Sequence, residues 1–245
     1  MNRKNYFVYL LLLLGGLLNI LNGCKGHEEE EEEEENPVNE NIVTDIDGNV
    51  YQTIKIGTQV WMAENLKVAH YRNGEEIETT TPVVLNVSEQ TLPFQWDYSD
   101  KVFFKEKDSI YGRLYNWYAV RDPRNICPKG WHIPTESEWA TLIDSLGGQL
   151  IAGGKMKMTG TIYWESPNLG ATDKIGFSAV PGGIRYANGG LFQYIGKECN
   201  YWTSTLDPTL TTGALTCRLH NERTTAFITG LYIGHAASVR CIKDQ

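Results

Sequence analysis

The sequence lacks the motifs that carry most metal, nucleotide and hydrolytic chemistry. No Cys-x-x-Cys pair occurs, and no Cys/His spacing matches a zinc site. Neither a phosphate-binding glycine loop nor a serine nucleophile elbow stands out. Because these patterns are missing, we expect no metal and no cofactor.

An excess of positive charge is also missing. The chain has 22 Lys+Arg against 30 Asp+Glu, a formal net charge of −8. Three of the basic and eight of the acidic residues precede residue 36, so the remaining 19 Lys+Arg and 22 Asp+Glu leave a net charge of −3. A nearly neutral domain predicts no nucleic-acid partner.

Long apolar runs are absent except at the N-terminus. Residues 2–4 include Arg and Lys, and residues 6–20 are Leu-rich but too short and too Gly-interrupted to favour a membrane span. The next residues, Leu21-Asn22-Gly23-Cys24, resemble a bacterial lipobox. We therefore expect a signal peptide over 1–23 and a lipidated Cys24 that anchors a lipoprotein to the membrane. An ordinary signal peptide followed by an unrelated cysteine is the alternative.

Eight consecutive glutamates, Glu28–Glu35, follow the expected anchor. Such a run repels itself and buries no apolar surface, which predicts a solvated tether over 24–40 and a folded domain over 41–245. An acidic run behind a lipidated cysteine resembles the export signal of Bacteroidetes lipoproteins. That resemblance implies an outer-membrane protein exposed at the cell surface, whereas a plain spacer is the alternative.

Cysteine is scarce after the anchor. The four remaining cysteines are Cys127, Cys199, Cys217 and Cys241. An even number in an exported protein indicates disulfides, and the sequence alone permits three pairings.

The strongest local pattern is a helix that begins after Thr135. Thr135 and Glu138 form a capping box, and Gly147-Gly148 favour a left-handed end. Between them, four apolar residues follow helical spacing: Trp139, Leu142, Ile143 and Leu146.

Elsewhere the residue composition favours short strands, short helices and turns. Asp47-Gly48 predicts a hairpin turn, which we favour over a calcium loop because the EF-hand pattern is not met, and Gly57-Thr58 is a second candidate turn. Tyr111 to Val120 has helical spacing but an aromatic content that also suits a strand, and we favour a short helix. From Gly160 onward, Gly, Asn, Asp and Pro punctuate short aromatic pieces. A central helix flanked by short strands predicts an α+β fold whose sheet is mainly antiparallel.

The chain resembles the Fibrobacter succinogenes major paralogous domain over roughly residues 43–244. The blocks that carry this resemblance, in order, are DIDGNVYQTIKIGTQVWMAENL, YGRLYNWYAV, CPKGWHIPTESEW, GFSAVPGGIR, YWTST and SVRCIKD. The resemblance implies an exported bacterial domain and no particular activity.

A second resemblance concerns the fold. HIPTESEW and the later Trp202-Thr203-Ser204 are similar to segments of the formylglycine-generating enzyme family, whose fold is related to C-type lectins. This implies a C-type lectin-like fold with one or two helices and long structured loops. It also implies disulfides Cys127–Cys241 and Cys199–Cys217. Neither that family's catalytic cysteine pair nor the calcium motifs of sugar-binding lectins are matched, so no catalytic residue carries over.

Aromatic residues are dense in the loop-rich region where lectin-like folds build binding surfaces. The candidate ligand-binding residues are Trp164, Arg185, Tyr186, Tyr194 and Tyr201, although core packing is the alternative for each ring. Cys217 and His220 could form a thiol nucleophile with its base, and His132 could act as a general base; we favour structural roles for all three.

We therefore expect a non-catalytic surface lipoprotein that binds an extracellular glycan or protein. One alternative is an enzyme or accessory module that acts on polysaccharide. Another is a structural component of a surface assembly.

Overall fold

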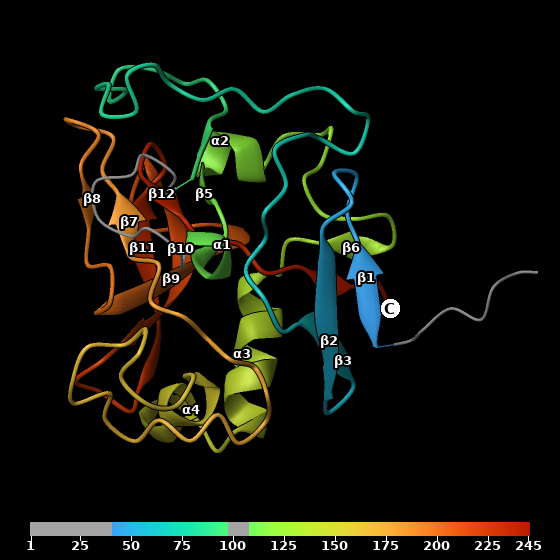
Figure 1. Ribbon diagram of the computed structural model, residues 1–245, viewed down its shortest axis with the longest axis vertical. Helices are drawn as coiled ribbons and strands as arrows, with labels where there is room; N and C mark the ends of the chain where they lie inside the picture. Colours follow the sequence, from blue (N-terminus) through green and yellow to red (C-terminus); the bar gives the residue numbers. More distant parts are fainter. Residues whose placement is uncertain (1–40, 98–107) are drawn as a thin grey trace, which may run out of the picture. The chain divides into compact units, whose positions relative to one another are not determined.

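The first and last strands of the described chain share one sheet (Figure 1). The computed structural model describes residues 41–97 and 108–245. The sheet order is β1 (Ile42–Thr44), β2 (Val50–Ile56), β3 (Gln59–Met62), β13 (Ile242–Lys243) and β6 (Trp131–His132). The predictions on the signal peptide, Cys24 and the acidic run fall on residues 1–40, which lie outside the described residues.

Two turns in this sheet follow the sequence pattern. Gly48 and Gly57 have φ angles of 81° and 61°, the left-handed region that glycine adopts without strain. Gly48 lies in the turn between β1 and β2, and Gly57 lies between β2 and β3. The alternating strands on either side therefore fold back on themselves as hairpins.

The other named strands of the described residues form two further sheets. One has the order β11 (Ala226–Tyr232), β10 (Gly213–His220), β9 (Glu198–Leu206). The other has the order β4 (Gln95–Trp96), β5 (Leu114–Asn116), β12 (Ala236–Ala237), β7 (Ile184–Arg185), β8 (Phe192–Gln193). All pairs of named strands are antiparallel, so the α+β, mainly antiparallel prediction is confirmed.

The predicted central helix is present. Helix α3 spans Glu136–Ser145, and both halves of the Thr135/Glu138 capping box are formed. Gly147 and Gly148 have φ angles of 94° and 89° and separate α3 from α4 (Gln149–Met156). In Figure 1, α3 stands between β2 and β3 on one side and β9–β11 on the other.

The short helix predicted over 111–120 is only partly correct. Tyr111 ends helix α1 (Asp108–Tyr111), strand β5 (Leu114–Asn116) follows, and helix α2 covers only Trp117–Val120. Gly112, with a φ of 69°, stops α1, and β5 pairs with both β4 and β12. Pairing with distant strands thus overrides the helical spacing of the tyrosines.

The aromatic core lies beneath α3. Trp139 stacks on Tyr201 with ring centroids 5.5 Å apart, and the ring centroids of Trp61 and Trp139 are 4.7 Å apart. The Arg240 guanidinium lies 4.3 Å from the centre of the Phe177 ring and donates to Asn65. Every one of these side chains is buried, so α3 is joined to the sheets by close packing.

One of the two expected disulfides is present. Cys127 and Cys241 are bonded, with Cα atoms 6.0 Å apart across 114 residues of sequence. In the chain-entropy model, closing a loop of this length contributes about 4–5 kcal/mol to stability. The bond ties the segment before α3 to the last strand.

The expected Cys199–Cys217 disulfide is wrong: both residues are free and buried. They lie on neighbouring strands but are offset, because Cys199 pairs with Leu219 and Cys217 pairs with Tyr201. Diagonal neighbours in an antiparallel sheet are about 7–8 Å apart, which exceeds the usual Cα–Cα range of a disulfide.

Candidate functional site

The β9–β10–β11 sheet has two chemically different faces. Side chains alternate along each strand, and Cys199, Tyr201, Cys217 and Leu219 are buried in the core cluster that contains Trp139. We call this the inner face. Their neighbours point to the opposite side, which we call the outer face; it carries Glu198, Asn200, Arg218 and His220 on β9 and β10.

A cavity of about 300 Å³ opens over the outer face. It is lined by Ile184, Tyr186, Tyr194, Glu198, Asn200, Arg218, Gly230, Leu231, Tyr232 and His235. Its walls are mainly aromatic and its floor is polar. This volume is at the lower end of the range found for small-ligand pockets.

A second cavity of about 110 Å³ adjoins the first, since Glu198 and Arg218 line both. Its other lining residues are His220, Arg223, Thr225 and Phe227. We refer to the two cavities together as the outer-face groove. The groove therefore runs along the β9–β10–β11 sheet. Tyrosines lie at one end, Arg218 lies where the two cavities meet, and Arg223 lies at the other end, which we call the arginine end.

Tyr194 is held in the groove wall by an unfavourable backbone conformation. Its φ is 62°, and the other non-glycine residues with positive φ in the described ranges are Asn, Asp or Ser. A bulky residue rarely adopts this left-handed region, which costs about 1–2 kcal/mol. Its side chain is 41% exposed. The fold thus places a large exposed ring at the groove against its local preference.

Tyr186 lies beside Tyr194 in the same wall. A side-chain hydrogen bond with Tyr194, together with burial, raises the pKa of Tyr186 to about 12. The Tyr186 phenol is therefore neutral near pH 7 and keeps a hydroxyl group that donates and accepts hydrogen bonds.

His235 supports this wall from below. Its ring lies edge-on to Tyr186 and Tyr232, with centroid distances of 4.7 and 5.2 Å. Burial lowers the pKa of His235 to about 4, and its Nδ1 accepts the backbone N–H of Ala187 at 3.0 Å. The neutral ring therefore carries its proton on Nε2 and acts as a hydrogen-bond donor at that atom.

Glu198 is held by neighbours on the same face. Its carboxylate lies 3.8 Å from His220 Nε2 and accepts from Asn200 Nδ2 at 3.4 Å. His220 Nδ1 accepts the N–H of Glu222 at 3.0 Å, which places the His220 proton on Nε2, toward Glu198. The floor thus offers one oriented carboxylate with a single histidine beside it.

Lys157 fixes the backbone at the arginine end of the groove. Its Nζ donates to the carbonyls of Leu169, His220 and Arg223 at 2.8 to 3.0 Å. Burial lowers its pKa to about 8. This buried ammonium holds the turn after β10, from which Arg223 extends.

The structure separates the five sequence-predicted binding residues into two groups. Tyr186 and Tyr194 line the groove. Trp164, Arg185 and Tyr201 are buried. Trp164 Nε1 donates to Ala179 O, Tyr201 stacks on Trp139, and the Arg185 guanidinium lies 3.9 Å from the Trp96 ring centre and donates to backbone carbonyls. These three residues pack the core.

Sequence reasoning missed most of the polar groove residues, namely Glu198, Asn200, Arg218, Arg223, Tyr232 and His235. Alternation along 198–202 and 216–220 was available as a pattern. It did not show which face is open, because that depends on the packing of α3.

The Cys217/His220 pair considered for catalysis does not come together. Cys217 points to the inner face and His220 to the outer face, since they are three residues apart on one strand. Burial raises the pKa of the Cys217 thiol, so it is protonated at neutral pH. The geometry supports no thiol nucleophile here.

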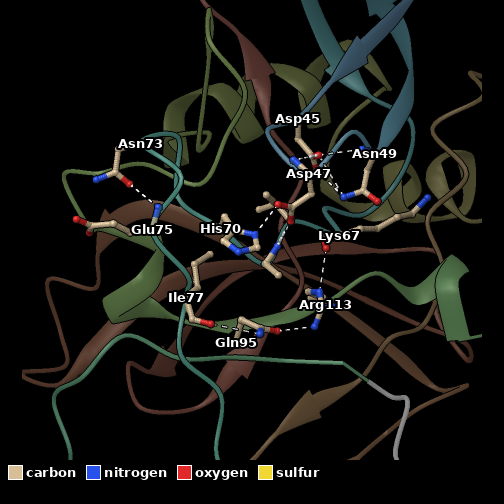
Figure 2. Close-up of polar contacts among 12 residues, drawn as sticks. Asp45, Asp47, Asn49, Lys67, His70, Asn73, Glu75, Ile77, Gln95 and Arg113 are labelled. Carbon is tan, nitrogen blue, oxygen red and sulfur yellow. Dashed lines mark hydrogen bonds and ion pairs between the residues drawn. The ribbon is translucent and has the colours of Figure 1, made fainter.

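In the turn that superficially resembles a calcium loop, the carboxylates find their hydrogen-bond partners within the protein. Asp45 accepts from the backbone N–H groups of Asp47 and Asn49, and Tyr51 donates to it at 2.5 Å. Asp47 contacts His70 Nδ1 at 2.6 Å (Figure 2). The carboxylates therefore hold the turn against the segment that contains His70, as the hairpin interpretation requires.

Further along the chain, side chains link strand β4 to loop segments that are distant in sequence. Gln95 donates to the carbonyl of Ile77 and accepts from Arg113 Nη1 at 2.7 Å (Figure 2). Arg113 also donates to the Lys67 carbonyl at 2.9 Å. We assign these contacts a structural role, because the side chains involved are already hydrogen-bonded to other groups of the protein.

His132, the other histidine considered as a base, bridges two carboxylates. Its Nδ1 lies 2.6 Å from Asp244 and its Nε2 lies 2.9 Å from Glu138. Burial alone would lower the pKa of His132, but the hydrogen bonds that its ring donates to these carboxylates outweigh the effect of burial and raise the pKa. His132 thus links α3 to the C-terminal segment.

Within residues 41–97 and 108–245, no group of three or more His, Cys, Asp or Glu side chains has the arrangement of a metal site. Over the same residues, no helix has both the length and the apolar character needed to cross a membrane.

Comparison with known proteins identifies a family. The model of the Fibrobacter succinogenes major domain matches residues 54–243, which is more than half of the chain. No curated protein and no solved structure matches.

Proposed function

The chain belongs to the Fibrobacter succinogenes major domain family, and we propose that its domain is a non-catalytic module that binds an extracellular glycan in the outer-face groove. The observation that carries the proposal is Tyr194, an exposed ring held in left-handed backbone at the wall of a cavity. Backbone strain of this kind clusters at functional sites. Retaining a tyrosine there is understandable if its ring contacts a ligand.

The composition of the groove suits a sugar. Aromatic rings such as Tyr186, Tyr194 and Tyr232 present flat apolar surfaces with polar tips. Glu198 and Asn200 supply hydrogen-bonding groups on the floor. A pocket that combines apolar walls with a few oriented polar groups is the usual arrangement for small-ligand recognition.

The groove does not favour glycoside hydrolysis. Most glycosidases need two carboxyl groups about 5–10 Å apart on opposite sides of the bond. Among the described residues that line the groove, Glu198 is the single carboxylate. This composition supports binding over turnover.

The proposal includes a C-type lectin-like fold and a surface location. The fold is supported by the sheet shared by the first and last strands and by the Cys127–Cys241 bond to the last strand. The location is supported by the lipobox-like segment before Cys24 and by the glutamate run that follows it. The groove would then face the extracellular medium on an acidic tether.

The test is a glycan array probed with the full-length chain, followed by titration calorimetry on the glycans that bind. We expect Tyr194→Ala to weaken binding about tenfold or more, since an anchor residue of this kind contributes more than about 1 kcal/mol. Ile162→Ala is the matched control, because Ile162 is exposed and lies outside both cavities.

Two results would contradict the proposal. One is an array without any bound glycan, or binding that Tyr194→Ala and Ile162→Ala affect equally. The other is turnover of a glycoside substrate by the unmodified chain that Glu198→Gln abolishes, which would assign an enzyme.

A further inference from the structure

Arg218 and Arg223 differ from the other arginines of the described chain. The other six either donate hydrogen bonds or lie over an aromatic ring: Arg72, Arg113, Arg121, Arg124, Arg185 and Arg240. No side-chain hydrogen bond, ion pair or ring contact involves Arg218 or Arg223 within the described residues. Both guanidinium groups are therefore available to a ligand.

Arg218 occupies the centre of the groove. It lies on β10 opposite Asn200 of β9 and Phe227 of β11, and it lines both cavities. It is half-buried, and Arg223 is exposed at the end of the smaller cavity. A guanidinium that is partly removed from water benefits from an anionic acceptor, because charge-assisted bonds are roughly twice as strong as neutral ones.

The charge of the groove opposes that of the chain. With histidines neutral, its lining has two arginines and one glutamate, whereas the whole chain has a net charge of −8. Glu198 already contacts His220 and Asn200, so it does not neutralise Arg218 directly. Local positive potential in a concave site attracts and orients an anion.

We infer that the glycan bound in the outer-face groove is an acidic one, whose anionic group pairs with Arg218 while its ring lies against Tyr186 and Tyr194. The inference rests on the proposed function. The anionic group is a uronate carboxylate or a sulfate ester, since both present the planar or forked oxygen acceptors that a guanidinium binds bidentately. Arg223 adds a second cation for a neighbouring charge along the chain.

The test compares three probes by titration calorimetry on the full-length chain: galactotriose, trigalacturonate and sulfated galactotriose. We expect at least one acidic probe to bind about tenfold more tightly than galactotriose. Arg218→Gln should remove that difference, so that the acidic probes no longer bind more tightly than galactotriose. Arg121→Gln, which changes an arginine outside the groove, should leave all three affinities unchanged.

Salt dependence provides a second readout that needs no variant. Raising the salt from about 0.05 M to about 0.5 M shortens the Debye length severalfold, and should weaken the acidic probes while sparing galactotriose. The relative affinities of the carboxylated and sulfated probes identify the source of the anion.

The outcomes separate the two proposals. Equal binding of neutral and acidic probes, or preference for the neutral one, would overturn the acidic ligand while the glycan site stands. An acidic preference that survives Arg218→Gln would overturn the role of Arg218. No binding of any probe, combined with an empty glycan array, would reject the glycan site itself.

Discussion

The inner face of the β9–β10–β11 sheet buries Tyr201 and Cys217 against Trp139, whereas the outer face leaves Arg218 and Glu198 at a groove. The two sets come from the same strands and alternate residue by residue. Packing partners make the difference: α3 covers one side, while the other carries cavities. Reactive residue types that are neighbours in sequence therefore need not share a site. Cys217 and Arg218 are adjacent, yet Cys217 faces the core and Arg218 faces the groove.

The largest expected effect is on the inner face. Tyr201→Ala removes a fully buried ring that stacks on Trp139 and donates to Asn65 at 3.1 Å. We expect a loss of about 3–5 kcal/mol in the free energy of unfolding, because the cavity and the lost packing add. Equilibrium denaturation in guanidinium measures it.

Asn200→Ala, one residue away on the outer face, is the matched change for Tyr201→Ala. It removes a long hydrogen bond to Glu198 and should lower the free energy of unfolding by about 1 kcal/mol. Equal losses for the two variants would mean that the faces do not differ as described.

A milder change tests the inner face by polarity alone. Cys217→Ser keeps the shape of the side chain but places a hydroxyl in an apolar cluster. We expect about 1–3 kcal/mol of destabilisation, the cost of burying a hydroxyl without a partner. Arg218→Gln, the next residue, should change stability by no more than about 0.5 kcal/mol. A larger loss of unfolding free energy from Arg218→Gln than from Cys217→Ser would contradict the assignment of the inner face as core and the outer face as open.

The outer face allows stability and binding to be separated. Tyr194→Gly relieves left-handed strain of about 1–2 kcal/mol, and the extra freedom of glycine in the unfolded chain offsets about 0.4–1 kcal/mol of that gain. We expect the melting temperature to stay the same or rise slightly while glycan affinity falls. A clear drop in melting temperature would show that Tyr194 serves the fold.

The smallest effect concerns the helix that covers the inner face. The raised pKa of His132 means that its contribution to stability is fully present below its unfolded pKa of about 6.5 and is lost as pH rises through its folded pKa. Its bonds to Glu138 and Asp244 are partly exposed, so the effect should stay below about 1 kcal/mol.

Denaturation of the unmodified chain and of His132→Asn at several pH values between about 5 and 9 measures this effect. The stability difference between them should shrink as pH rises. A difference that grows with pH would contradict the assignment of His132 as a protonated bridge.

Local patterns were read correctly where neighbours in sequence decide the structure. The capping box of Thr135 and Glu138, the Gly147-Gly148 break and the turns at Gly48 and Gly57 all involve contacts within a few residues. The segment 111–120 was read incorrectly, because its middle pairs with β4 and β12 from other parts of the chain.

The candidate site was predicted in part. Aromatic density points to Tyr186 and Tyr194, but it does not distinguish exposed rings from buried ones and therefore points equally to Trp164 and Tyr201. The Cys127–Cys241 bond followed from a family resemblance, whereas Cys199 and Cys217 were paired without knowledge of their strand register.

Residue patterns alone are enough to give helix α3, its caps, the short antiparallel strands and the family to which the chain belongs. Only the tertiary structure decided which side of the β9–β10–β11 sheet is core and which is open. The physical reason is that alternation places residues on two faces equally well, and the side that α3 covers depends on long-range packing of Trp139 against Tyr201. That choice turns Arg218 toward solvent and Cys217 into the core.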